Sequence, residues 1–190
     1  AYDQGAFNDV AFARMRPRLT AILQKLGLLK KEASVDSVIA DPEGDFAFGS
    51  LIRCSVSRFD KKLSTENKKV YACTGPLISK SFNEIPDVID RCVSEFLLDL
   101  PDRTGIVFFL GNTDSYVKSC QALIKNKFTT DFKQINPMVV WANNRYWINL
   151  AHPSGTNGHF NNWLNSDDGP GIKRVQAEYG VKLSRDRLLA

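Results

Sequence analysis

The sequence predicts an α/β fold in which a central, mostly parallel sheet lies between two layers of helices, a three-layer α/β/α sandwich. Two observations predict this class. Short apolar runs alternate along the chain with longer stretches whose apolar residues recur at helical spacing. The run at 106–110 is continuously apolar between Gly105 and Gly111, which is typical of a strand buried on both faces. Strands that alternate with helices form βαβ units, and such units build a parallel sheet.

The N-terminal half is expected to hold a long helix and a buried strand. The helix is predicted over 8–26, with Gly27 as its stop and Pro17 marking either a kink or a later start. The segment 46–54 follows a turn and is interpreted as a buried strand that ends in a loop. Residues 55–72 are polar and basic, and their simplest interpretation is a solvated loop outside the core.

The rest of the chain alternates helices and strands more regularly. Helices are predicted over 81–98, from Thr113 or Asp114 onward, over 157–165 and over 170–179, where Gly180 closes the last one. Strands are predicted over 106–110, 138–142 and 147–150. Ligands of open parallel sheets bind at the carboxyl ends of the strands. We therefore expect functional residues in the three segments that follow predicted strands, 50–57, 111–114 and 151–157.

Composition excludes several classes of protein. The 190 residues, 25 of them basic and 21 acidic, fit a single domain over 1–190 with a net charge of +4. The hydrophobic share of 43% is too high for a disordered chain, and no run approaches the roughly eighteen apolar residues of a membrane span.

Four dispersed cysteines favour reduced thiols in the cytoplasm. We expect a monomer that binds no membrane, and the charge permits a polyanionic partner without requiring one.

The most informative segment is 152–159, which contains both histidines of the chain, a proline and two glycines. A histidine at a strand exit can donate a hydrogen bond to charge that develops on a leaving group, while the backbone N–H groups of Ser154 and Gly155 bind a phosphate. The alternative is that His152 only ends the strand and the loop only turns. His152 and His159 match no standard zinc spacing, so we expect no metal site.

Several segments together are similar to one known family. WINLAHPSGTNGHFNNW, at 147–163, resembles the second motif of the uracil-DNA glycosylase superfamily and is closest to its single-strand-selective monofunctional branch. Upstream, 48–54 resembles the strand that carries the family's base-reading residue, and 71–77 resembles the Cys-x-Pro-x-Leu segment of bacterial and archaeal members. The strand exit at 107–111 matches the family's Leu-Gly pattern, and QGAF at 4–7 resembles the end of its first motif.

The resemblance implies a monofunctional DNA glycosylase of base-excision repair, which flips a uracil or other damaged base and hydrolyses its N-glycosidic bond. It implies that Phe7 stacks on the base, that Ser50 contacts it and that His152 stabilises the departing base anion. A staple residue before the first helix is the alternative role of Phe7. The partner is then DNA, with single strands among the candidates, in the cytoplasm, the bacterial nucleoid or the eukaryotic nucleus. The implied DNA contacts are Ser154, Gly155, Thr156, Asn157 and His159.

Two departures from the family pattern keep other functions open. In the family, a water-positioning Asp or Asn lies roughly ten residues before the stacking Phe, but only six residues precede Phe7 here. We therefore expect the domain to begin after that part of the first motif. The water-positioning residue is then either upstream of Ala1 or absent. Ser50 stands where most members have an Asn, and a hydroxyl cannot present a donor and an acceptor in one fixed plane. The alternatives are a superfamily member that binds nucleic acid without cutting it, and a protein whose His152 loop holds a small phosphorylated ligand.

The cysteines are expected to carry no cofactor. Some branches of the family hold a [4Fe–4S] cluster with two cysteines near the N-terminus and two at positions that resemble Cys54 and Cys73. No Cys precedes Cys54 here, and Cys92 and Cys120 fall in apolar helical stripes that favour buried thiols. Only an upstream pair of cysteines would complete such a cluster.

Overall fold

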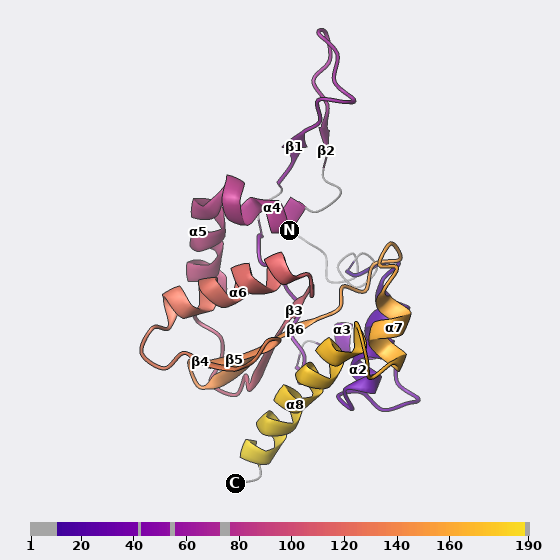
Figure 1. Ribbon diagram of the computed structural model, residues 1–190, viewed down its shortest axis with the longest axis vertical. Helices are drawn as coiled ribbons and strands as arrows, with labels where there is room; N and C mark the ends of the chain where they lie inside the picture. The colour runs from indigo at the N-terminus through magenta and orange to yellow at the C-terminus, as the bar shows by residue number, and fades with distance from the viewer. Residues whose placement is uncertain (1–10, 42, 54–55, 73–76, 189–190) are drawn as a thin grey trace. The chain divides into compact units, whose positions relative to one another are not determined.

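The computed structural model describes residues 11–41, 43–53, 56–72 and 77–188 (Figure 1). The chain divides into two compact units. We call Ala1–Phe48 with Arg103–Ala190 the sheet unit and Gly49–Asp102 the hairpin unit, and describe each by itself. None of the helices in the described ranges combines the length and the apolar character that crossing a membrane requires.

The sheet unit is built around a four-stranded sheet of mixed direction. Its strand order is β3-β6-β5-β4, where β3 is Ile106–Leu110, β4 is Lys133–Asn136, β5 is Val139–Ala142 and β6 is Arg145–Leu150. β3 runs parallel to β6, whereas β5 is antiparallel to both β6 and β4. The α/β class is confirmed. The prediction of a mostly parallel sheet is wrong, because β3–β6 is the parallel pair and the other two pairs are antiparallel.

The dipeptide Asn143-Asn144 explains the antiparallel pairs. Both residues have positive φ, 49° and 62°, in the left-handed region that asparagine tolerates better than most residues. A two-residue loop with both φ positive is a type I′ turn, which joins antiparallel strands because its twist matches theirs. The strands predicted at 138–142 and 147–150 are therefore two arms of one hairpin, with Ala142 paired to Arg145. No room is left between them for a crossover helix.

The sheet unit also contains five helices in the described part of the chain. They are α2 at Arg16–Lys25, α3 at Val35–Ile39, α6 at Asp114–Lys127, α7 at Phe160–Asn165 and α8 at Gly171–Leu188. The helix predicted over 8–26 begins at Arg16, which agrees with the later start that Pro17 indicated. Pro17 lies in the first turn, where its missing N–H removes no helical hydrogen bond. The strand predicted over 46–54 is wrong for its described residues, 46–53. Phe46 and Phe48 are half-buried against the apolar cluster that α2 and α3 form, and they pair with no strand in the described part of the chain.

Helix α8 continues through Gly180, where the sequence predicted its end. A Cβ atom on Gly180 would lie 2.8 Å from Cγ2 of Val139 and 2.9 Å from Cδ1 of Ile148. The glycine therefore allows the backbone of α8 to approach the sheet, and its role is packing rather than helix termination. Ala177 and Val181, on either side of it in the helix, are buried in the same core cluster as these two sheet residues.

The hairpin unit contains β1 at Arg58–Phe59 and β2 at Tyr71–Ala72, which pair antiparallel, followed by α4 at Leu77–Glu84 and α5 at Pro86–Phe96. The single helix predicted over 81–98 is thus two helices. They separate at Ile85, whose φ of −141° and ψ of 54° are not helical, because a following proline disfavours the helical conformation of the residue before it. Within the segment interpreted as a solvated loop, residues 58–72 form a hydrogen-bonded hairpin that extends away from α4 and α5 (Figure 1).

Gly180→Ala is expected to lower the free energy of unfolding by about 1 kcal/mol. Overpacking against Val139 and Ile148 costs about 1–3 kcal/mol and exceeds the gain of up to about 1 kcal/mol in helix propensity. Urea unfolding monitored by circular dichroism measures the change. Lys182→Ala, at an exposed position of the same helix, should stay within about 0.5 kcal/mol of the wild type. A Gly180→Ala protein more stable than the wild type would contradict the packing role.

Candidate functional site

The parallel pair β3–β6 brings two of the predicted strand exits side by side. Its register pairs Leu110 with Leu150, and the backbone N–H of Gly111 donates to the carbonyl of Leu150 at 2.8 Å. The side-chain amide of Asn149, which is 2% exposed, donates to the carbonyl of Gly111 at 3.0 Å. The segments 111–114 and 151–157 therefore leave the same edge of the sheet.

Helix α6 packs tightly behind this edge. A Cβ atom on Gly111 would lie 2.6 Å from the ring of Tyr116, so only glycine allows the strand end to approach this helix so closely. The thiol of Cys120 is hydrogen-bonded to the side chains of Tyr116 and Asn149, and burial raises the pKa of Cys120 to about 12. A thiol that stays protonated at neutral pH is a poor nucleophile. Tyr116 and Cys120 therefore support the strand end rather than react there.

The loop between β6 and α7 holds its shape through its own side chains. Asn157 donates from Nδ2 to the carbonyl of His152 at 2.9 Å, and its Oδ1 accepts from the N–H of His159 at 3.2 Å. The hydroxyl of Ser154 accepts from the N–H of Thr156 at 3.3 Å and lies 2.9 Å from the Thr156 hydroxyl. The backbone N–H of Asn157 closes a turn onto the carbonyl of Ser154 at 3.1 Å. Three residues predicted to contact DNA thus also organise the loop.

The hydrogen bonds of His152 select one form of its ring. The backbone N–H of Ser154 donates to Nδ1 of His152 at 3.1 Å. Because Nδ1 is the acceptor, the proton of the neutral imidazole lies on Nε2. Although His152 is exposed at the loop surface, the surrounding protein removes enough water to lower its pKa below the usual 6.5. At neutral pH the ring is therefore an uncharged N–H donor, and Nε2 meets no acceptor within the described part of the chain.

Arg18 of α2 anchors this loop, and the sequence did not identify it. Its guanidinium donates to the carbonyl of Ser154 and, at 3.3 Å, to the carbonyl of Asn157. The same group lies 4.7 Å from the centre of the Phe160 ring, a cation–π contact at the start of α7. The contact with Ser154 spans 136 positions of sequence, so no local pattern predicts it. The one signal in the sequence was the position of Arg18, four residues before Ile22 and therefore on the apolar side of the predicted helix.

The backbone amides predicted to bind phosphate differ from one another. The amide of Ser154 is already bonded to His152. The amide of Gly155 has no acceptor among the residues that the structure describes, and this glycine is exposed. A Cβ atom on Gly155 or Gly158 would meet nothing within 4 Å. This side of the loop is therefore open to a ligand, with Thr156 and His159 exposed beside the two glycines.

The remaining predicted site residues lie elsewhere. Ser50 belongs to the hairpin unit, where it is exposed and outside any helix or strand. Phe7, Cys54 and Cys73 lie outside the described residues. Within the described ranges, no group of three His, Cys, Asp or Glu side chains could hold a metal ion.

Comparisons with protein-family models, with curated proteins and with solved structures found no match to this chain. The function must therefore be inferred from the fold and the site. Together they define an α/β protein with a neutral hydrogen-bond donor, His152, in a preformed loop at the carboxyl end of a parallel strand pair.

Arg18→Met is expected to loosen the His152 loop while keeping the length of the side chain. Loss of the hydrogen bonds from a charged donor to two loop carbonyls should lower the free energy of unfolding by about 1–2 kcal/mol. It should also speed the hydrogen exchange of the Asn157 and Phe160 amides, which close the turns of the loop. Lys25→Met, at an exposed position of the same helix, serves as the control. Equal exchange rates in both variants would contradict the anchoring role.

Proposed function

We propose that the protein is a monofunctional DNA glycosylase, a hydrolase that releases uracil or another damaged base from a nucleotide flipped out of the stack. The observation that carries the proposal is the geometry of His152. Its Nδ1 is occupied by the N–H of Ser154 at 3.1 Å, which leaves Nε2–H as the donor. A fixed, uncharged donor suits a leaving group whose negative charge develops only as the bond breaks.

In the proposed reaction the C1′–N bond of the damaged nucleotide breaks and the base leaves with its electron pair. Water supplies a hydroxyl group to C1′, and its proton ends on the released base. His152 would donate from Nε2–H to the base carbonyl oxygen on which the negative charge develops. Because the loop already holds the ring in place, little reorganisation is needed as the charge forms, and this is the condition under which such donors are effective.

The open side of the loop supports a nucleic-acid partner. Gly155, Thr156 and His159 are exposed, and the glycines allow a phosphate to come close to the backbone. In the proposal these residues, with Ser154 and Asn157, contact DNA beside the flipped nucleotide. Phe7 and Ser50 keep their proposed roles as base-stacking and base-contacting residues.

The proposal includes a three-layer α/β/α arrangement of the sheet unit. Side chains alternate across a strand, so Ile148 and Asn149 of β6 lie on opposite faces of the sheet. Ile148 packs near Gly180 of α8, and Asn149 is hydrogen-bonded to Cys120 of α6. This alternation supports one helix layer on each face.

The test is base release from a single-stranded oligonucleotide that contains one uracil or one hypoxanthine. Relative to the full wild-type chain, His152→Ala should reduce the single-turnover rate by about 10²–10³-fold, the usual effect of losing one such donor. His152→Gln retains an N–H donor and should lose less. Lys182→Ala, at an exposed position of α8, is the control for handling and expression.

Equal rates for the wild type and His152→Ala would contradict the role of His152. Absence of release by both proteins across several lesions would contradict the activity itself. Two other functions would then be separated by binding. Affinity for the strand with a steep salt dependence would favour a superfamily member that binds without cutting. Absence of DNA affinity at low salt would favour a small phosphorylated ligand in the His152 loop.

A further inference from the structure

The β1–β2 hairpin exposes aromatic rings that the hairpin unit does not bury. Phe59 is 42% exposed and Tyr71 is 57% exposed. The two residues are register partners in an antiparallel pair, so their side chains lie on the same face of the hairpin. Their ring centres are 5.8 Å apart with an angle of 61° between the planes, an edge-to-face pair. Leu63, further along the hairpin, is 65% exposed. Large apolar side chains exposed on one hairpin indicate a binding surface.

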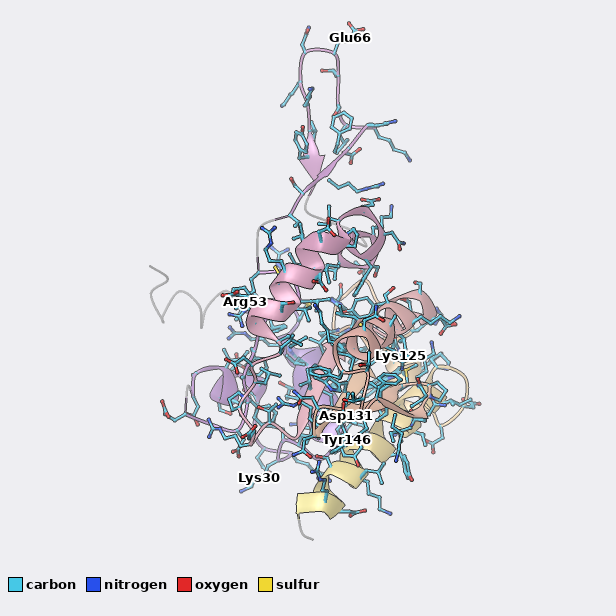
Figure 2. The ribbon with its side chains drawn as sticks, turned by 90° about the vertical axis from the view of Figure 1, so that its left-hand side faces the viewer. Lys30, Arg53, Glu66, Lys125, Asp131 and Tyr146 are labelled. Carbon is cyan, nitrogen blue, oxygen red and sulfur yellow. The ribbon has the colours of Figure 1, made fainter. Side chains whose placement is uncertain are left out.

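The hairpin is ordered by backbone bonds that do not depend on these rings. Asp60 N–H donates to the carbonyl of Val70 at 2.9 Å, and Thr65 and Lys68 exchange two backbone bonds at 2.9 and 3.2 Å. The hydroxyl of Ser64 accepts from the N–H of Val70 at 2.9 Å. Glu66 lies at the tip (Figure 2). The chain therefore maintains a defined scaffold that presents Phe59 and Tyr71 without covering them.

The positive charge of the chain is concentrated on the same hairpin. Residues 58–71 hold five basic and two acidic residues, a net charge of +3 in a chain whose net charge is +4. Arg58 is neutralised by Glu84 of α4, with two contacts at 3.0 and 2.9 Å that tie the base of the hairpin to that helix. The other four basic residues are exposed and pair with no carboxylate in the described part of the chain. They are Lys61, Lys62, Lys68 and Lys69.

We propose that this hairpin is a binding surface for single-stranded DNA, with bases stacked on Phe59 and Tyr71 and phosphates paired with the lysines. Bases in a duplex are stacked on their neighbours, so only an unpaired strand presents base faces to exposed rings. A protein partner would use the apolar side chains but would leave the unpaired positive charge unexplained. The choice of DNA over RNA rests on the proposed function. The binding surface itself requires no base release.

Fluorescence anisotropy of labelled oligo(dT) over a salt series tests this surface on the full chain. The double variant Phe59→Leu, Tyr71→Leu keeps apolar area but removes both rings, and should weaken binding at least about fivefold. The exchange Phe59→Tyr, Tyr71→Phe keeps two rings and should retain wild-type affinity. Amide exchange at Val70 checks that the hairpin still forms in each variant.

The lysines are tested in the same assay with matched charge changes. Lys68→Gln, Lys69→Gln should weaken binding and reduce the slope of log affinity against log salt by about 1.4, the value for two phosphate contacts on a single strand. Lys30→Gln, Lys31→Gln removes the same charge from an exposed site of the sheet unit and is the control. An equal loss of slope in both proteins would overturn the assignment of the charge to the hairpin.

Other outcomes would overturn the proposal as a whole. These are no oligo(dT) binding at low salt, wild-type affinity in the Leu double variant, or duplex DNA bound as tightly as the single strand. The measurements are repeated in a His152→Ala background on an undamaged strand. If binding by the His152→Ala protein still depends on Phe59 and Tyr71, the hairpin surface is supported even when no base is released. The failure of this inference is therefore distinguishable from the failure of the proposed activity.

Discussion

The parallel pairing of β3 with β6 is the constraint on which the site depends. It brings the ends of both strands to one edge, where Gly111 N–H binds the carbonyl of Leu150 and the buried amide of Asn149 binds the carbonyl of Gly111. A buried amide must keep its partners, since an unpaired one costs about 1–3 kcal/mol. His152 lies two residues beyond Leu150, so its position is largely set by a strand pair in the core rather than by the loop alone.

The loop adds a second level of constraint. Its polar side chains bind its own backbone, and Arg18 connects it to α2 and to the Phe160 ring. The ring of His152 is therefore held before any ligand arrives, with its neutral form favoured by the partial loss of surrounding water and its Nδ1 occupied by Ser154. Such preorganisation is the physical link between the packing of the sheet unit and the chemistry that we propose for it.

Much of the sheet unit could be predicted from the sequence because its signals are local. Apolar runs identified β3, β5 and β6, and the residues that follow β6 identified the His152 loop. Strand direction was predicted wrongly, because periodicity does not distinguish a hairpin from a crossover and the turn at Asn143-Asn144 was not recognised. The sequence predicts a helix end at Gly180 because the approach of α8 to the sheet is a tertiary contact, which no local pattern shows. Arg18 was missed for the same reason, since its partners lie at the other end of the chain.

The central claim is that the protein holds His152 as a neutral ring with its proton on Nε2. Long-range ¹H–¹⁵N correlation spectra of the full chain at neutral pH measure this directly, with His152→Gln to assign the signals. We expect a protonated Nε2 and an unprotonated, hydrogen-bond-accepting Nδ1. A proton on Nδ1, or protons on both ring nitrogens, would contradict the account.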